Sequence, residues 1–110
     1  MPAKIHGNLG SVAPAVATPT ALYAVPASRK ATGTLTICNQ NASEVAVRVA
    51  VVNGAISGVA AKDYREYDTK VAANGVLEKS GVPVAAGYTL MVRSDTANVA
   101  FNFDGIEEDA

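Results

Sequence analysis

Few residues in this chain of 110 could carry out acid–base, nucleophilic or metal chemistry. His6 is the only histidine and Cys38 the only cysteine. A Ser–His–Asp triad, a Cys–His pair or a zinc site needs several such groups at matched positions. One histidine near the N-terminus cannot supply them, so we expect no enzymatic activity, no metal and no other cofactor.

The densest acidic cluster, formed by Asp63, Glu66 and Asp68, does not match a catalytic or metal-binding pattern. It lacks the D-x-[DN]-x-[DN]-G spacing of a calcium loop, and tyrosines and an arginine separate its carboxylates. Charges on both faces are instead typical of an edge strand that is protected from pairing with other sheets. We therefore predict an exposed edge strand at 63–71. The residues predicted to contact a partner there are Tyr64, Arg65 and Tyr67.

Composition argues against nucleic-acid and membrane partners. The formal net charge is −1 and the basic residues are scattered, whereas nucleic-acid binding usually needs a basic stripe. The longest apolar windows are interrupted by polar residues, so none reaches the roughly 18 residues of a membrane helix. The segment 1–7 lacks the apolar stretch of a signal peptide, and we expect synthesis in a reducing compartment. Cys38 cannot form an intramolecular disulfide, which leaves a thiol contact between subunits as its possible functional role.

Short alternating strands, with turn signals about every 8–12 residues, are the main structural pattern. The clearest is 45–51, where Val45, Val47, Val49 and Val51 alternate with smaller or polar residues. In 31–39 the alternation places Cys38 on a face lined by threonines. We predict an all-β fold, an antiparallel β-sandwich of seven or eight strands, immunoglobulin-like or related, with no helix longer than a turn.

The chain divides into three predicted parts. Residues 1–20 contain proline and glycine among small residues and are predicted to form an extended N-terminal arm. The sandwich domain is expected at 21–106, and 107–110 is expected to be an acidic, solvated tail. The apolar residues of the arm are too dispersed for a core of their own, so we expect another chain to bury them by strand addition. These predicted partner-binding residues are Ile5, Leu9, Val12 and Val16.

Several strand sequences resemble one protein family. The segments are Leu22-Tyr23-Ala24-Val25-Pro26-Ala27, Thr34-Leu35-Thr36-Ile37-Cys38-Asn39-Gln40 and Val45-Ala46-Val47-Arg48-Val49-Ala50, followed by Asp63-Tyr64-Arg65-Glu66-Tyr67-Asp68, Ala73-Asn74-Gly75-Val76-Leu77-Glu78 and Tyr88-Thr89-Leu90-Met91-Val92-Arg93-Ser94. Together they are similar to small virion structural proteins of tailed bacteriophages, over about residues 21–105. These are scaffold motifs, and the arm lies outside the resemblance.

The resemblance implies a non-catalytic building block of a virion, synthesised in the host cytoplasm. Its partners would be other copies of itself, as a homo-oligomer, and other virion proteins on the particle exterior. Capsid decoration and a neck, tail or baseplate position both remain open. The alternative is a β-sandwich module that binds a glycan or receptor through a tyrosine-bearing face. The lack of tryptophan argues against this alternative, because sugar platforms favour large aromatic rings.

Overall fold

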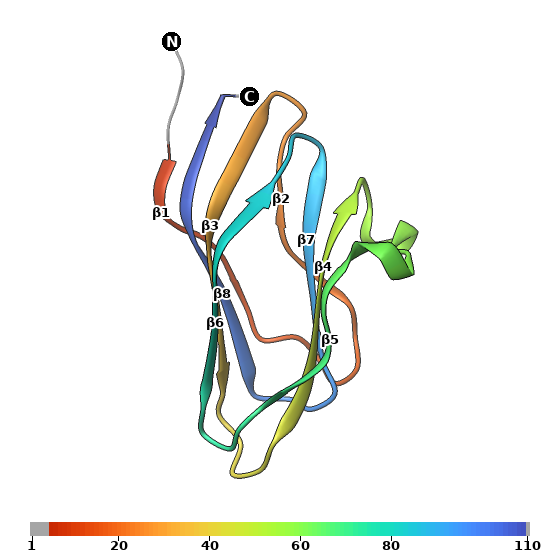
Figure 1. Ribbon diagram of the computed structural model, residues 1–110, viewed down its shortest axis with the longest axis vertical. Helices are drawn as coiled ribbons and strands as arrows, with labels where there is room; N and C mark the ends of the chain where they lie inside the picture. Colours follow the sequence, from red (N-terminus) through yellow and green to blue (C-terminus); the bar gives the residue numbers. More distant parts are fainter. Residues whose placement is uncertain (1–4, 110) are drawn as a thin grey trace.

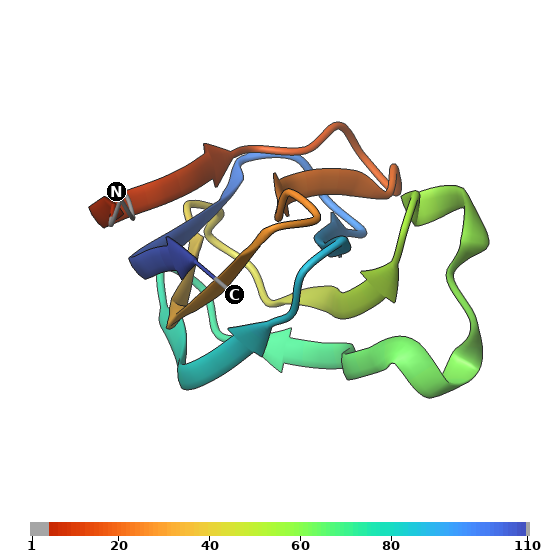
Figure 2. The same cartoon turned by 90° about the horizontal axis from the view of Figure 1, so that it is seen from above.

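A computed structural model describes residues 5–109, except the side chains of Ile5 and His6. Eight antiparallel strands form two sheets that pack as a sandwich (Figure 1, Figure 2). The first sheet has the order β1-β8-β3-β6 and the second the order β2-β7-β4-β5. The all-β sandwich prediction is therefore confirmed. The strands are β1 (Ile5–Val12), β2 (Thr20–Ala24), β3 (Arg29–Asn39), β4 (Val45–Asn53), β5 (Tyr64–Val71), β6 (Val76–Val84), β7 (Tyr88–Ser94) and β8 (Val99–Asp109).

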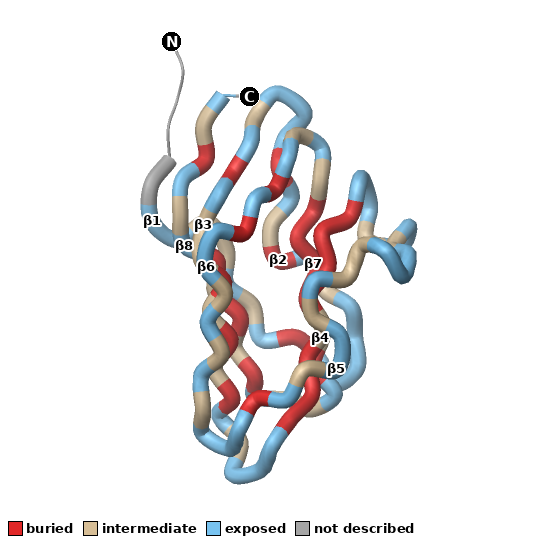
Figure 3. The backbone as a smooth tube through the Cα atoms, in the orientation of Figure 1, coloured by how far each residue is buried: buried red, intermediate tan, exposed pale blue. Residues whose placement is uncertain are grey.

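The core lies between the two sheets, where alternate residues of facing strands meet. β3 and β8 pair without interruption from Arg29↔Asp109 to Asn39↔Val99. This register places Leu35 beside Phe103 and Ile37 beside Phe101, and all four side chains are fully buried. Figure 3 shows buried and more exposed residues along the strands of both sheets. The predicted alternation in β3 is confirmed, because its threonines and Cys38 lie on the more exposed outer face.

The second sheet is covered on its outer face as well. After β4, the chain forms two short 3₁₀ turns, η1 (Ile56–Gly58) and η2 (Ala61–Asp63). Side chains from this connection pack over a small outer cluster that contains Ala50, Val52 and Met91. β4 is consequently buried on both faces along most of its length, although its alternation predicted only a half-buried strand. No helix in the described residues is long and apolar enough to cross a membrane.

The expected N-terminal arm is largely part of the sandwich, and this corrects the prediction. β1 pairs with β8 of its own chain from Ile5↔Glu107 to Val12↔Phe101, and it lies beside β8 in Figure 1. Leu9 and Val12 pack against the chain's own core rather than awaiting a partner. One edge of β8 pairs with β3, and its other edge pairs with β1 of the same chain. The strand addition that we expected between two chains therefore takes place within one chain.

The expected solvated tail is also a strand. β8 continues to Asp109, and the side chain of Glu107 lies on the inner face with only 10% of its surface exposed. Arg29, at the start of β3, pairs with the carboxylates of Glu107 and Asp109 and so compensates their charge. A buried carboxylate requires such a partner, which the local sequence of the tail does not reveal.

Three glycines lie in register across the first sheet, Gly7↔Gly105↔Gly33. β3 and β8 approach each other so closely here that a Cβ on Gly105 would overlap the carbonyl oxygen of Thr32 and the Cα of Gly33. A Cβ on Gly33 would overlap the carbonyl oxygen of Asp104. Backbone on both sides leaves little room for relaxation, so the central strand pair requires glycine at these positions.

We expect Gly105→Ala to lower the free energy of unfolding by about 1–3 kcal/mol, because the added methyl group forces the two strands apart. Gly58→Ala is the matched control, since a Cβ there meets nothing within 4 Å. It should remain within about 1 kcal/mol of wild type. Urea denaturation measures both, and equal stabilities would contradict the close approach of β3 and β8.

Val49 tests the position of the core, because it is fully buried at the centre of β4. Val49→Ala should cost about 1–2.5 kcal/mol through lost methyl groups and a small cavity. Val49→Asp should cost several times more, comparable to the whole stability of a small domain, because it buries an unpaired charge. Val76→Asp, at a valine that is 61% exposed, should have little effect. Urea unfolding that ranks Val49→Asp with Val76→Asp would contradict the assigned register.

Candidate binding surface

Cys38, Asp63, Glu66 and Asp68 are not part of a metal-binding cluster in the described part of the chain. Among the side chains that the structure describes, no three of His, Cys, Asp or Glu lie close enough together to hold a metal ion. The side chain of His6 lies outside the described residues. Cys38 is a free thiol, half-buried on the outer face of β3, and lies in register with Val76 of β6 and Ala100 of β8. Its role as an intersubunit thiol stays a prediction.

The predicted edge strand is β5, and it is irregular in a way that creates a surface feature. Its pairing with β4 shifts twice, from Val47↔Thr69 to Val49↔Glu66 and then to Ala50↔Tyr64. Each shift inserts one extra residue in β5, which is the signature of a β-bulge. The first bulge includes Asp68, whose φ of 54° is in the left-handed region.

The bulges bring Tyr64 and Tyr67 to the same side of the strand. Residues three apart in a regular strand point to opposite faces. Here the two rings meet edge to face, with centroids 5.0 Å apart and an interplanar angle of 85°. Such a pairing is a favoured aromatic geometry. The sequence identified both tyrosines as edge residues but could not show that they form a corner.

Arg48 of β4 holds the exposed ring of Tyr67. Its guanidinium carbon lies 4.1 Å from the ring centroid, a cation–π contact. Nε of Arg48 donates to Oδ1 of Asp68 at 2.6 Å and a second nitrogen donates to Oδ2 at 3.1 Å. These bonds lower the pKa of Asp68 and raise that of Arg48, so both groups stay charged and paired. The planar guanidinium of Arg48 therefore holds the ring of Tyr67 in place, and the Arg48–Asp68 pair remains electrically neutral.

The connection between β4 and β5 supplies the opposite wall. Oδ2 of Asp63 accepts a hydrogen bond from the backbone N–H of Ala60 at 2.8 Å, which fixes the η2 turn. This bond, followed by one from Lys62, lowers the pKa of Asp63. Between this wall and the tyrosines is a hollow of about 520 Å³. We call it the tyrosine hollow; it is lined by Val59, Ala60, Ala61, Tyr64 and Tyr67.

The remaining aromatic and edge residues lie apart from this hollow. Tyr64 also packs against the outer cluster, whereas Tyr67 is 58% exposed. Arg65, predicted with them, is exposed on β5 but does not line the hollow. Tyr23 packs in the sandwich, 5.9 Å from the ring of Phe103, and Tyr88 is packed against the main core. Two of the four tyrosines therefore form one surface.

A polar clasp joins the two sheets on the side of the molecule that carries β5 and β6. Lys79 of β6 donates to Oε2 of Glu66 at 3.1 Å, and the hydroxyl of Thr69 donates to Oε1 at 2.7 Å. The bond from Thr69, supported by Lys79, lowers the pKa of Glu66 below its ordinary value. The clasp is therefore a side-chain link between β5 and β6, which are edge strands of different sheets.

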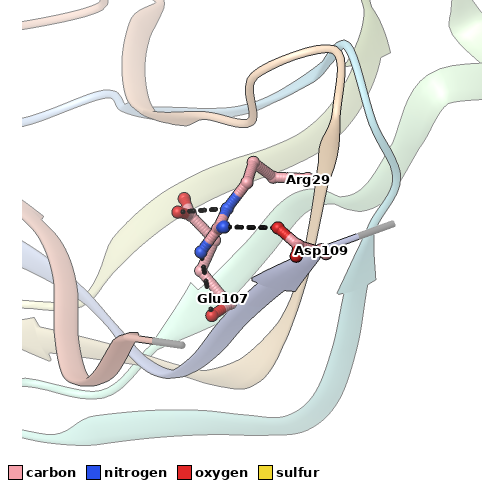
Figure 4. A network of polar contacts seen from close by, with 3 residues as sticks. All are labelled: Arg29, Glu107 and Asp109. Atoms are coloured by element: carbon pink, nitrogen blue, oxygen red, sulfur yellow. Dashed lines mark hydrogen bonds and ion pairs between the residues drawn. The ribbon is translucent and has the colours of Figure 1, made fainter. Parts of the chain in front are cut away.

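A second polar network ties the start of β3 to the end of β8 (Figure 4). Nε of Arg29 donates to Glu107 at 3.1 Å, and another guanidinium nitrogen donates to Asp109 at 2.7 Å. The side chain of Arg29 is only 13% exposed. Because its acceptors are carboxylates already paired within the chain, we assign this network a structural role in joining β3 to β8.

Glu66 gives the clasp a pH signature. Because folding lowers the pKa of Glu66, its ionised carboxylate stabilises the fold above about pH 4.3. This stabilisation is lost as the pH falls through the pKa of Glu66 in the folded state. Glu66→Gln should therefore be less stable than wild type at pH 7, and the difference should shrink toward pH 3. Urea unfolding of both proteins at the two pH values measures it. A difference that stays constant with pH would contradict the ionic clasp.

Comparisons with known proteins show only a distant structural similarity. No protein-family model matches the chain, and no curated protein matches it. Two crystal structures are similar, each described as a pentameric capsid protein isolated from metagenomic phage sequences. Both are 20% identical to this chain, and each match covers 91% of this chain. The TM-scores are 0.38 and 0.37. The chain spans 61% and 62% of the length of those two proteins.

Proposed function

We propose that this protein is a non-catalytic structural component of a tailed-bacteriophage virion, and that it docks to other copies of itself and to other virion proteins on the particle exterior. The strand motifs of residues 21–105 are the basis for assigning it to a virion. Capsid decoration and a neck, tail or baseplate position fit this function equally.

The composition of the tyrosine hollow is the observation that carries the docking role. Its walls are aromatic and aliphatic, and several charged groups beside it are engaged within the chain. Arg48 is paired with Asp68, and Asp63 is bonded to Ala60 and Lys62. Tyrosine is enriched among the residues that dominate protein–protein binding energy. An aromatic corner beside which Arg48, Asp68 and Asp63 are engaged within the chain supports protein contact rather than proton transfer.

One observation supports the alternative, a glycan-binding module: Tyr64 and Tyr67 lie on the same face. Sugar recognition also needs polar groups that fix the hydroxyls, and the lining of the hollow offers no charged or amide side chain. We therefore favour a protein partner. A glycan array with the purified protein discriminates between the two, since saturable binding to one glycan class would favour the alternative.

The virion role predicts saturable attachment of the purified protein to particles that lack it. We expect Tyr67→Ala to weaken attachment at least tenfold, a loss of about 1.4 kcal/mol that is typical of an aromatic anchor. Val76→Asp changes a similarly exposed residue elsewhere and should attach normally. Co-sedimentation over a range of protein concentrations gives both affinities. Failure of the wild-type protein to co-sediment would contradict the proposed function.

A further inference from the structure

We propose that the tyrosine hollow receives the turn Ala15–Thr18 of a second copy of this chain, with the side chain of Val16 inserted between the tyrosines and the η2 wall. The inference rests on the proposed function and deepens it, because it names the contact between copies. Val16 was predicted to bind a partner, and the structure leaves it 57% exposed while Leu9 and Val12 are used in the chain's own core.

The turn that presents Val16 is fixed by three hydrogen bonds. The backbone N–H of Thr18 donates to the carbonyl of Ala15 at 3.2 Å, and the hydroxyl of Thr18 donates to the carbonyl of Val16 at 3.0 Å. The N–H of Ala17 donates to the carbonyl of Ser94 at 2.8 Å, which anchors the turn to β7. A preformed turn loses little conformational entropy on docking.

The backbone of this turn is strained in a way that favours a function. Ala17 has φ 53°, a left-handed conformation that is costly for alanine. Glycine or asparagine is the usual residue at such a turn position. Strained backbone conformations cluster at active sites, ligand clamps and switch regions. In this turn the strained residue directly follows the exposed Val16.

The turn and the hollow are chemically complementary. From Ser11 to Ser28 the chain has no charged residue, so the turn brings no charge to the contact. The hollow is lined by aliphatic and tyrosine side chains with no charged residue among them, and the neighbouring Arg48 is paired with Asp68. Its volume of about 520 Å³ is within the range of pockets that enclose small ligands, and it therefore has room for Val16 with part of its turn.

The positions of the two surfaces require a second copy. The turn leads into β2 at one edge of the second sheet, whereas the hollow lies over β5 at the opposite edge. Each copy therefore offers one turn and one hollow on different sides. Such a contact is heterologous, and it joins copies head to tail into a ring or a filament.

Sedimentation velocity over a range of concentrations tests this contact. Wild type should form assemblies, and Val16→Asp and Tyr67→Ala should each weaken association at least tenfold. Val76→Asp, at the comparably exposed valine of β6, should associate as wild type does. An equimolar mixture of Val16→Asp with Tyr67→Ala should form dimers and nothing larger, because one variant retains the hollow and the other retains the turn.

A blocked peptide of residues 13–19 provides a direct measurement with the same proteins. In NMR spectra of Val16→Asp, the peptide should shift the signals of Tyr64 and Tyr67, and a peptide with aspartate at position 16 should not. The inference would be overturned if the peptide shifts no NMR signals and the wild-type protein remains monomeric. Equal loss of assembly in Val76→Asp, or binding of a glycan in the hollow without self-association, would also overturn it. Because attachment to particles is measured separately, a protein that attaches without self-associating would refute this contact and leave the virion role intact.

Discussion

The pairing of β8 with β3 is the interaction on which the rest of the structure depends. β8 carries both phenylalanines of the chain, and each is fully buried in a core that otherwise consists mainly of valine, leucine and alanine. Each buried aromatic ring removes more apolar area from water than any of the smaller side chains around it. The close glycine contact between the strands and the Arg29 network fix their register at one end. β1 pairs with the other edge of β8, so β8 joins β1 to β3 within the first sheet.

The edge strands β5 and β6 explain why contacts between copies at these two edges should involve side-chain surfaces rather than added strands. β5 has two bulges and several charges, and β6 contains Pro83 and a bulge beside Gly81 with φ 67°. These are the features that prevent one sheet from extending another. In β5, the same irregularity creates the tyrosine corner. Protection of the edge and formation of a docking surface therefore have one structural origin.

Much of the sandwich could be predicted because its main strands have one face in the core, and a period of two then appears directly in the sequence. β1 could not, since Gly7 and Gly10 remove the side chains that would show the alternation. The burial of Glu107 depends on Arg29, which is 78 residues away in the sequence. The tyrosine corner depends on two register shifts, and a sequence pattern carries no signal for an inserted residue. Long-range pairing, rather than local propensity, determined each of these features.

Backbone strain links the two halves of the proposed contact. Four residues other than glycine have positive φ in the described part of the chain, and Asn74 and Asn98 occupy turns in which asparagine adopts this conformation readily. The other two are Ala17, which shapes the exposed turn, and Asp68, which forms the bulge beside Tyr67. Alanine in this conformation costs the fold about 1–2 kcal/mol. Its presence is understandable if the direction of Val16 contributes more through assembly than the strain costs the isolated subunit.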